Sequence, residues 1–155
     1  MSFRIRGLSP EPFVPLYGLA EAELAARGVL RFAVDKTPGF PDRVEMRDAA
    51  PGETVLLMNH VCQPADTPYR AAHAIFVREG ATKTFDEVGV VPDVLRPRLL
   101  SLRAFDDGGM MIDADVVDGM QVEEANRRVR DNHAVSYIHA HYAKRGCYAG
   151  RIERA

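Results

Sequence analysis

The sequence is poor in cysteine, balanced in charge and without long apolar runs. Its two cysteines, at positions 62 and 147, are too few for a disulfide framework, so we expect a reducing cytoplasm. The 22 acidic and 20 basic residues nearly balance, which excludes a general electrostatic attraction to nucleic acid or to an anionic membrane. No apolar run has the length of a membrane span or of a signal-peptide core. We therefore predict a cytoplasmic protein with no nucleic-acid or membrane partner.

The length and the apolar content are those of one globular domain, residues 1–155. Hydrophobic residues make up 46% of the chain, which is enough for a buried core. Alternating or apolar runs predict strands at 3–6, 29–35, 54–61, 73–79, 98–105 and 110–117. Helices are predicted at 19–28 and 121–132, with one more turn after Pro92. This order predicts an α+β fold with a largely antiparallel or mixed sheet, two or three short helices and a C-terminal β-hairpin.

Apolar and acidic side chains alternate along residues 110–117. One face of this strand carries Met110, Ile112, Ala114 and Val116. Asp113 and Asp115 point the other way. Such alternation is typical of an antiparallel strand with one wet face, so we assign both carboxylates to solvent rather than to a cation site or an acid–base pair.

The C-terminal segment YIHAHYAKRGCYAGRI holds the side chains with the most reactive chemistry. His139 and His141 lie two apart on a strand, so both leave the same face. A three-residue loop with Gly146 in the left-handed conformation would pair Ala143 with Cys147 and add the thiol to that face. A loop of two or four residues would instead set Cys147 on the other face. A lone glycine at the third loop position favours the three-residue loop.

On a shared face, Cys147, His141 and His139 support two chemistries. His141 could take the thiol proton and leave a catalytic thiolate. Alternatively, the same three side chains could bind zinc with one open position, although no cofactor is favoured. The simpler alternative is that both histidines and Tyr137 line a half-buried sheet face and are satisfied by their neighbours.

The loop PADTPYRAAH is the second candidate, because binding groups concentrate on loops held by a rigid sheet. Arg70 presents a planar fork of donors that suits a carboxylate or a phosphate. Tyr69 can stack or hydrogen-bond, and His73 opens the following strand. We predict that these three residues bind substrate. The alternative is that Arg70 pairs with an acid and that His73 is half exposed.

Several longer strings carry a family resemblance: FRIRGLSPEPF, PADTPYRAAHAIFVREGA, LLSLRAFD, DADVVDG and YIHAHYAKRGCYAGRI. Together they resemble a bacterial family known only as a domain of unknown function, DUF1203, over nearly the whole chain. The resemblance implies a small single-domain bacterial protein. It implies no activity, no cofactor and no catalytic residue.

Two functional hypotheses follow from these residues. The first is a small cytoplasmic enzyme that acts on a small polar or anionic substrate, with Cys147 or the two histidines reacting and Arg70 as the anion anchor. The second is a non-catalytic protein that binds a small ligand or forms a homodimer through a sheet edge or an apolar face. A composite site requires the strand of His73 to lie beside the C-terminal hairpin.

Overall fold

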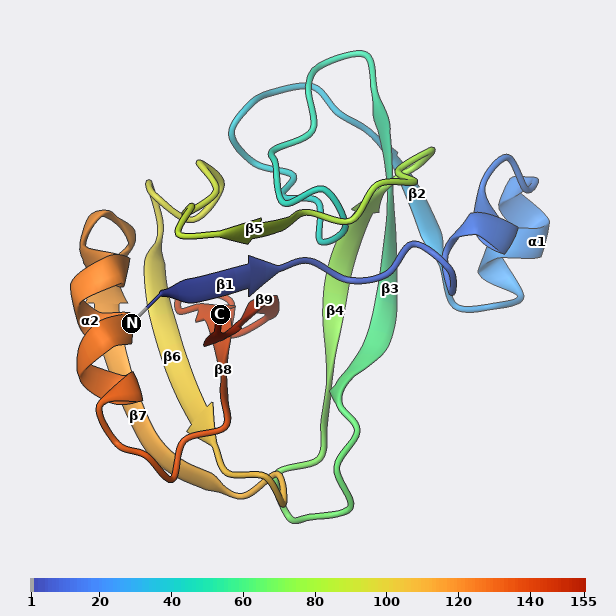
Figure 1. Cartoon of the computed structure of the whole chain (residues 1–155). Helices are drawn as coiled ribbons and strands as arrows, with labels where there is room; N and C mark the ends of the chain where they lie inside the picture. Colours follow the sequence, from blue (N-terminus) through green and yellow to red (C-terminus); the bar gives the residue numbers. More distant parts are fainter. Residues whose placement is uncertain (1) are drawn as a thin grey trace.

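Two antiparallel sheets carry most of the regular structure (Figure 1). The computed structural model describes residues 2–155. The larger sheet has the strand order β5-β1-β9-β8-β6-β7, and the smaller sheet has the order β2-β3-β4. The strand bounds are β1 Phe3–Arg6, β2 Leu30–Ala33, β3 Thr54–Gln63, β4 Ala71–Arg78, β5 Asp86–Val88, β6 Leu99–Phe105, β7 Met111–Asp118, β8 Tyr137–Tyr142 and β9 Tyr148–Arg154. The α+β class, the antiparallel pairing and the C-terminal hairpin β8–β9 are confirmed.

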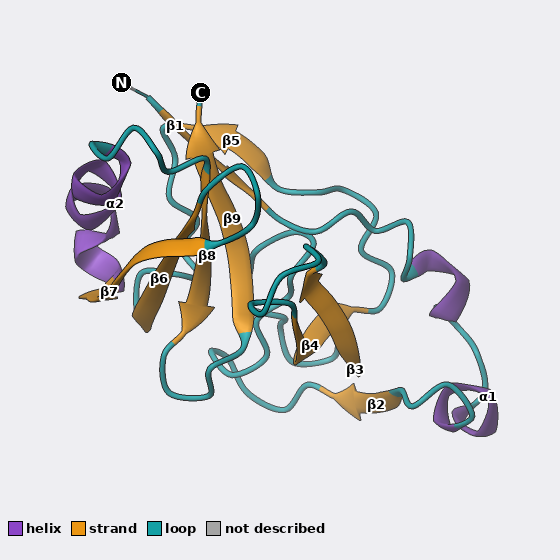
Figure 2. Cartoon of the chain, turned by 90° about the horizontal axis from the view of Figure 1, so that it is seen from below, coloured by secondary structure: helices purple, strands orange, loops and turns teal. Residues whose placement is uncertain are grey.

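Two short α-helices lie at opposite ends of the molecule (Figure 2). α1 spans Glu21–Ala25 and α2 spans Val122–Arg130, and short 3-10 helices η1 and η2 span Val14–Leu16 and Gly119–Gln121. The helical turn predicted after Pro92 is wrong, because residues 93–97 form turns, so helix is scarcer than expected. Within residues 2–155, no helix combines the length and the apolar character needed to cross a membrane.

One face of the large sheet is apolar and is covered by α2. Val122, Ala125 and Val129 are buried on one stripe of this helix, as its amphipathic pattern predicts. They belong to one cluster with side chains of β6 and β8: Leu100, Leu102, Ala104, Ile138 and Ala140. This layer leaves the opposite face of β6 and β8 free to meet the small sheet.

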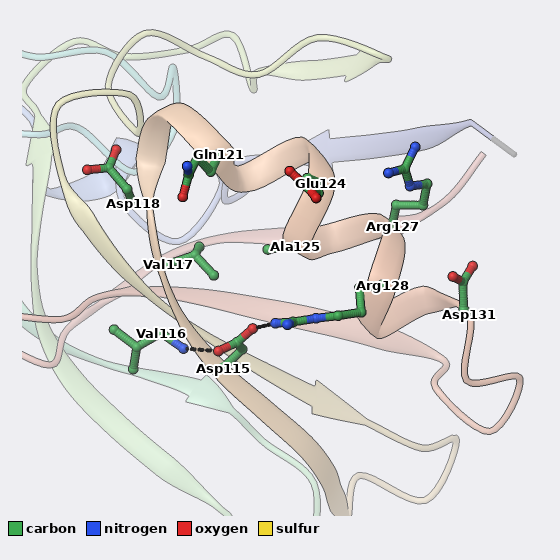
Figure 3. Close-up of a pocket in the computed structure, with 10 residues that line it drawn as sticks. All are labelled: Asp115, Val116, Val117, Asp118, Gln121, Glu124, Ala125, Arg127, Arg128 and Asp131. Atoms are coloured by element: carbon green, nitrogen blue, oxygen red, sulfur yellow. Dashed lines mark hydrogen bonds and ion pairs between the residues drawn. The ribbon is translucent and has the colours of Figure 1, made fainter.

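Strand β7 orients its faces differently from the sequence expectation. Ile112 and Val116 are exposed, whereas Val117 packs against the main core. Asp115 does not simply face water: it forms an ion pair with Arg128 of α2 (Figure 3). The assignment of Asp115 to solvent is therefore wrong, because α2 crosses the acidic face of this edge strand. Alternation identifies two faces but does not say which of them a helix will cover.

Candidate functional site

Strands β6 and β8 together build a polar and aromatic face. Ser101, Arg103 and Phe105 of β6 lie directly opposite His141, His139 and Tyr137 of β8. Directly paired residues of antiparallel strands share a face, so these six side chains form one layer. The prediction that Tyr137, His139 and His141 line one sheet face is confirmed.

The inner face of the small sheet is turned toward this layer. The His73 ring of β4 lies 4.9 Å from the His141 ring, measured between centroids. On β3, Gln63 Nε2 donates a hydrogen bond of 3.0 Å to Tyr137 Oη. The strand of His73 therefore does lie beside the C-terminal hairpin, as a composite site requires.

A cavity of about 240 Å³ lies where the two sheets meet. Its lining residues are Cys62, Gln63, Pro68, Tyr69, Arg70, Ala71, His73, Arg103, Phe105, Met111, His139 and His141. The structure thus brings together five of the six predicted site residues: Tyr69, Arg70, His73, His139 and His141. None of the lining residues is an acid, which makes the cavity electropositive.

His141 is held in one tautomer by the turn that follows it. Its Nδ1 lies 2.9 Å from the carbonyl oxygen of Gly146. A carbonyl oxygen only accepts hydrogen bonds, so we assign the proton to Nδ1 and the lone pair to Nε2. Burial, reinforced by Arg103 and His73 and opposed by the Gly146 hydrogen bond, lowers the pKa of His141 to about 4. At neutral pH this residue is an uncharged imidazole with an acceptor nitrogen.

His139 and His73 are also kept neutral. Burial, with the charge of neighbouring groups including Arg103, lowers the pKa of His139 to about 3. Its ring packs edge-on against Tyr148 at 5.0 Å and tilted against Phe105 at 5.1 Å. Burial and Arg103 also lower the pKa of His73, whose Nε2 is buried and has no hydrogen-bond partner among the described residues. A buried polar atom without a partner is a place where a ligand atom can bind.

Two arginines give the cavity its positive charge. Arg103 Nε donates only a long hydrogen bond of 3.4 Å to Ser101 Oγ, and Arg70 Nη1 donates to the Pro64 carbonyl oxygen. In the part of the chain that the structure describes, neither guanidinium forms an ion pair with a carboxylate. Burial lowers the pKa of Arg103, as expected for a charge that has no anionic partner. An anion in the cavity would supply the missing partner.

The turn between β8 and β9 does not have the predicted register. Tyr142 N donates to the Cys147 carbonyl at 2.9 Å, and Gly146 N donates to the Tyr142 carbonyl at 2.7 Å. Tyr142 therefore pairs with Cys147 across a four-residue loop, 143–146. Gly146 does adopt the left-handed conformation, with φ of +75°. The prediction of a three-residue loop is wrong, because a left-handed glycine suits either loop length.

Cys147 consequently lies on the face away from the histidines. Its Sγ accepts a hydrogen bond of 3.2 Å from Arg43 Nη2, and Arg43 is 1% exposed. The Arg43 guanidinium also lies over the Tyr142 ring, 4.9 Å from its centroid. Cys147 and His141 therefore do not share a face, so the predicted reactive pair is wrong. Cys147 does not line the cavity.

The same geometry contradicts the predicted zinc site. Its three ligands, His139, His141 and Cys147, do not converge, because Cys147 points to the other side of the hairpin. Across residues 2–155, no group of three or more His, Cys, Asp or Glu side chains is placed to hold a metal ion.

Sequence reasoning missed Arg103, Phe105 and Gln63. A signal was present in LLSLRAF, where Ser101, Arg103 and Phe105 alternate with Leu100, Leu102 and Ala104. That pattern marks a polar face on β6, but the pairing of β6 with β8 joins segments more than thirty residues apart. The sequence offers no local sign of that pairing.

A second, wider hollow of about 680 Å³ lies between β7 and α2 (Figure 3). It is lined by charges of both signs, among them Asp118, Glu124 and Arg127, and Arg128 reaches across it to Asp115. Because its charges are mixed and partly paired, it has no excess of unpaired groups that would select a ligand. The cavity between the sheets is the better candidate.

One comparison, with protein-family models, agrees with the family resemblance. Neither the curated proteins nor the solved structures gave a match. A family model described as "Protein of unknown function (DUF1203)" matches residues 39–154, well over half of the chain. Every residue that lines the cavity falls inside this range. The chain belongs to the DUF1203 family.

Proposed function

We propose that the cavity between the sheets binds a small organic anion and that His141 performs an acid–base step on it. One observation carries this proposal: two guanidiniums without carboxylate partners and three neutral imidazoles converge on one cavity that has no acidic lining. A half-buried cation without a partner and strongly perturbed histidines are costly, and such groups concentrate at functional sites. Cys147 has no part in the proposed chemistry.

The bound anion would itself make His141 a better base. Burial is the main cause of the low pKa of His141 and the charge of Arg103 is a smaller one, so an anion that neutralises Arg103 raises this pKa in part. A hydroxyl or an ammonium group of the ligand can then donate its proton to Nε2, which leaves an alkoxide or a neutral amine on the ligand. The resulting imidazolium keeps its Nδ1–H hydrogen bond to Gly146 and is stabilised by the negative charge of the anion.

Binding is tested by titrating acetate into the protein while following the imidazole signals by NMR. We expect acetate to shift the signals of His73, His139 and His141 and to leave exposed His133 unchanged. Arg103→Met should weaken this response at least tenfold, since it removes the half-buried cation. Arg145→Met changes an exposed arginine of the β8–β9 loop and should alter the response less than twofold. Equal responses of the two variants would refute the proposal.

The acid–base role has its own measurement. The ¹⁵N shifts of His141 should show protonated Nδ1 and unprotonated Nε2 at neutral pH, and saturating acetate should raise the pKa of this ring. A protonated Nε2, or a pKa unmoved by acetate, would remove His141 from the role of base.

We further propose a cytoplasmic location in a bacterium, supported by the family resemblance and by Cys62 and Cys147, which are both free.

The alternative of a homodimer draws support from the exposed Leu30, Phe32 and Val61 on the small sheet. Light scattering tests the homodimer, because a monomer at high concentration excludes it.

A further inference from the structure

The cavity has one wall that the proposed anion site does not use. This wall is apolar, in contrast to the arginines and histidines, and consists of Phe105, Met111, Tyr69 and Pro68. Phe105 and Met111 are cross-strand partners on β6 and β7, so they stand side by side. A site for a bare inorganic anion has no need of such a wall.

The aromatic part of this wall is rigid. The Phe105 ring stacks on Tyr137, with centroids 5.3 Å apart and planes inclined by 18°. It also meets Tyr69 edge-on at 6.4 Å. Phe105 is 2% exposed, so its position is fixed by packing rather than by a ligand. Because Phe105 exposes so little surface, a further ring entering the cavity would pack mainly against Tyr69 and Met111, which Phe105 supports.

Charge and size limit the ligand further. Arg103 is the half-buried cation and Arg70 lies exposed at the loop, so one negative charge matches the interior. A single water needs about 10–15 Å³ of such a cavity, and 240 Å³ is therefore room for a molecule well beyond acetate. The cavity is smaller than most sites for drug-sized ligands, which start at about 300 Å³.

We infer that the ligand is a small arylcarboxylate, whose carboxylate meets Arg103 and Arg70 and whose ring lies against Met111 and Tyr69. This inference rests on the proposed anion site and names the class of molecule it selects. The amphipathic lining favours such a molecule over acetate and over phosphate, because neither of these anions has a ring to cover the apolar wall.

The test compares benzoate, acetate and inorganic phosphate by NMR titration of the full chain. Benzoate should bind at least tenfold more tightly than acetate, because the ring removes apolar surface from water. Met111→Ser should weaken benzoate about tenfold and leave acetate within twofold. Met110→Ser changes the neighbouring exposed methionine, which lies outside the lining, and should affect neither. Phe105→Leu, checked by thermal unfolding, gives a second variant of the wall.

The outcomes separate this inference from the proposed function. Acetate and benzoate binding equally, or phosphate binding more tightly than benzoate, would overturn the arylcarboxylate and leave the anion site standing. Benzoate affinity unaffected by both Met111→Ser and folded Phe105→Leu would also overturn it. If no anion shifts the cavity histidines, both proposals fail.

Discussion

Mild acid should destabilise this protein through its buried histidines, before the carboxylates paired with arginines protonate. His139 and His141 are 4% and 3% exposed, and burial lowers their pKa values to about 3 and about 4. In the unfolded chain each would titrate near pH 6.5. The unfolded state therefore binds more protons between about pH 6.5 and pH 4, so stability is full above this window and falls as the pH is lowered through it.

The expected loss is large for a domain of this size. Lowering the pH from 7 to 5 should cost about 2 kcal/mol of unfolding free energy for each histidine, or about 4 kcal/mol for the pair. Total stabilities are commonly about 5–15 kcal/mol. The paired carboxylates of Glu53 and Glu79, whose pKa values arginines lower to about 2, lose their contribution only at more acidic pH. The window from 7 to 5 thus separates the histidines from these two carboxylates.

Urea unfolding at a series of pH values measures this loss. His139→Phe should reduce the fall between pH 7 and 5 by about 2 kcal/mol, because a phenyl ring does not titrate and suits the ring cluster around this site. His133→Gln removes an exposed histidine and serves as the matched control. A pH profile of His139→Phe identical to that of the unsubstituted protein would refute the reasoning.

Three further predictions follow from the geometry of the hairpin and the loops. Since Cys147 and His141 leave opposite faces, His141→Ala should change the alkylation rate of Cys147 by less than twofold, as measured by mass spectrometry; a large slowing would restore their pairing. Cys62, whose pKa burial raises to about 11, should be alkylated slowly at pH 7 in the native state and rapidly in urea; equal rates would show an open thiol. Gly119→Ala should destabilise the protein by more than about 2 kcal/mol in urea unfolding, because the new Cβ would lie 1.9 Å from the Leu95 carbonyl oxygen, whereas Gly108→Ala, in an exposed turn, should cost less than about 1 kcal/mol.

The sequence predicts single strands of this fold better than it predicts their partners. The alternation in YIHAHY correctly separates Tyr137, His139 and His141 from Ile138 and Ala140, because a strand has only two faces. The loop of Arg70 is also recognisable from its prolines and its polar residues. These features depend on neighbours within a few residues, and so local reasoning suffices for them.

The remaining features depend on contacts between distant segments. Arg103 lies in the site only because β6 pairs with β8. Asp115 forms an ion pair instead of facing solvent only because α2 crosses β7. The loop is one residue longer than predicted, which places Cys147 on the opposite face of the hairpin. The register shift between Ala140 and His141 then restores the expected pairing farther along β9. A difference of one residue in a turn is below what residue preferences can distinguish.

The composite origin of the cavity has a consequence for the stability of the whole fold. Its walls come from β3 and β4 of one sheet and from β6, β7 and β8 of the other, and the His73–His141 contact lies between them. A ligand held by Arg70 and Arg103 would act as a non-covalent crosslink between the sheets. At a concentration one hundred times its dissociation constant, it would add about 2.7 kcal/mol to the free energy of unfolding. Slower amide hydrogen exchange in β4 and β8 together would then report occupancy without any assay of catalysis.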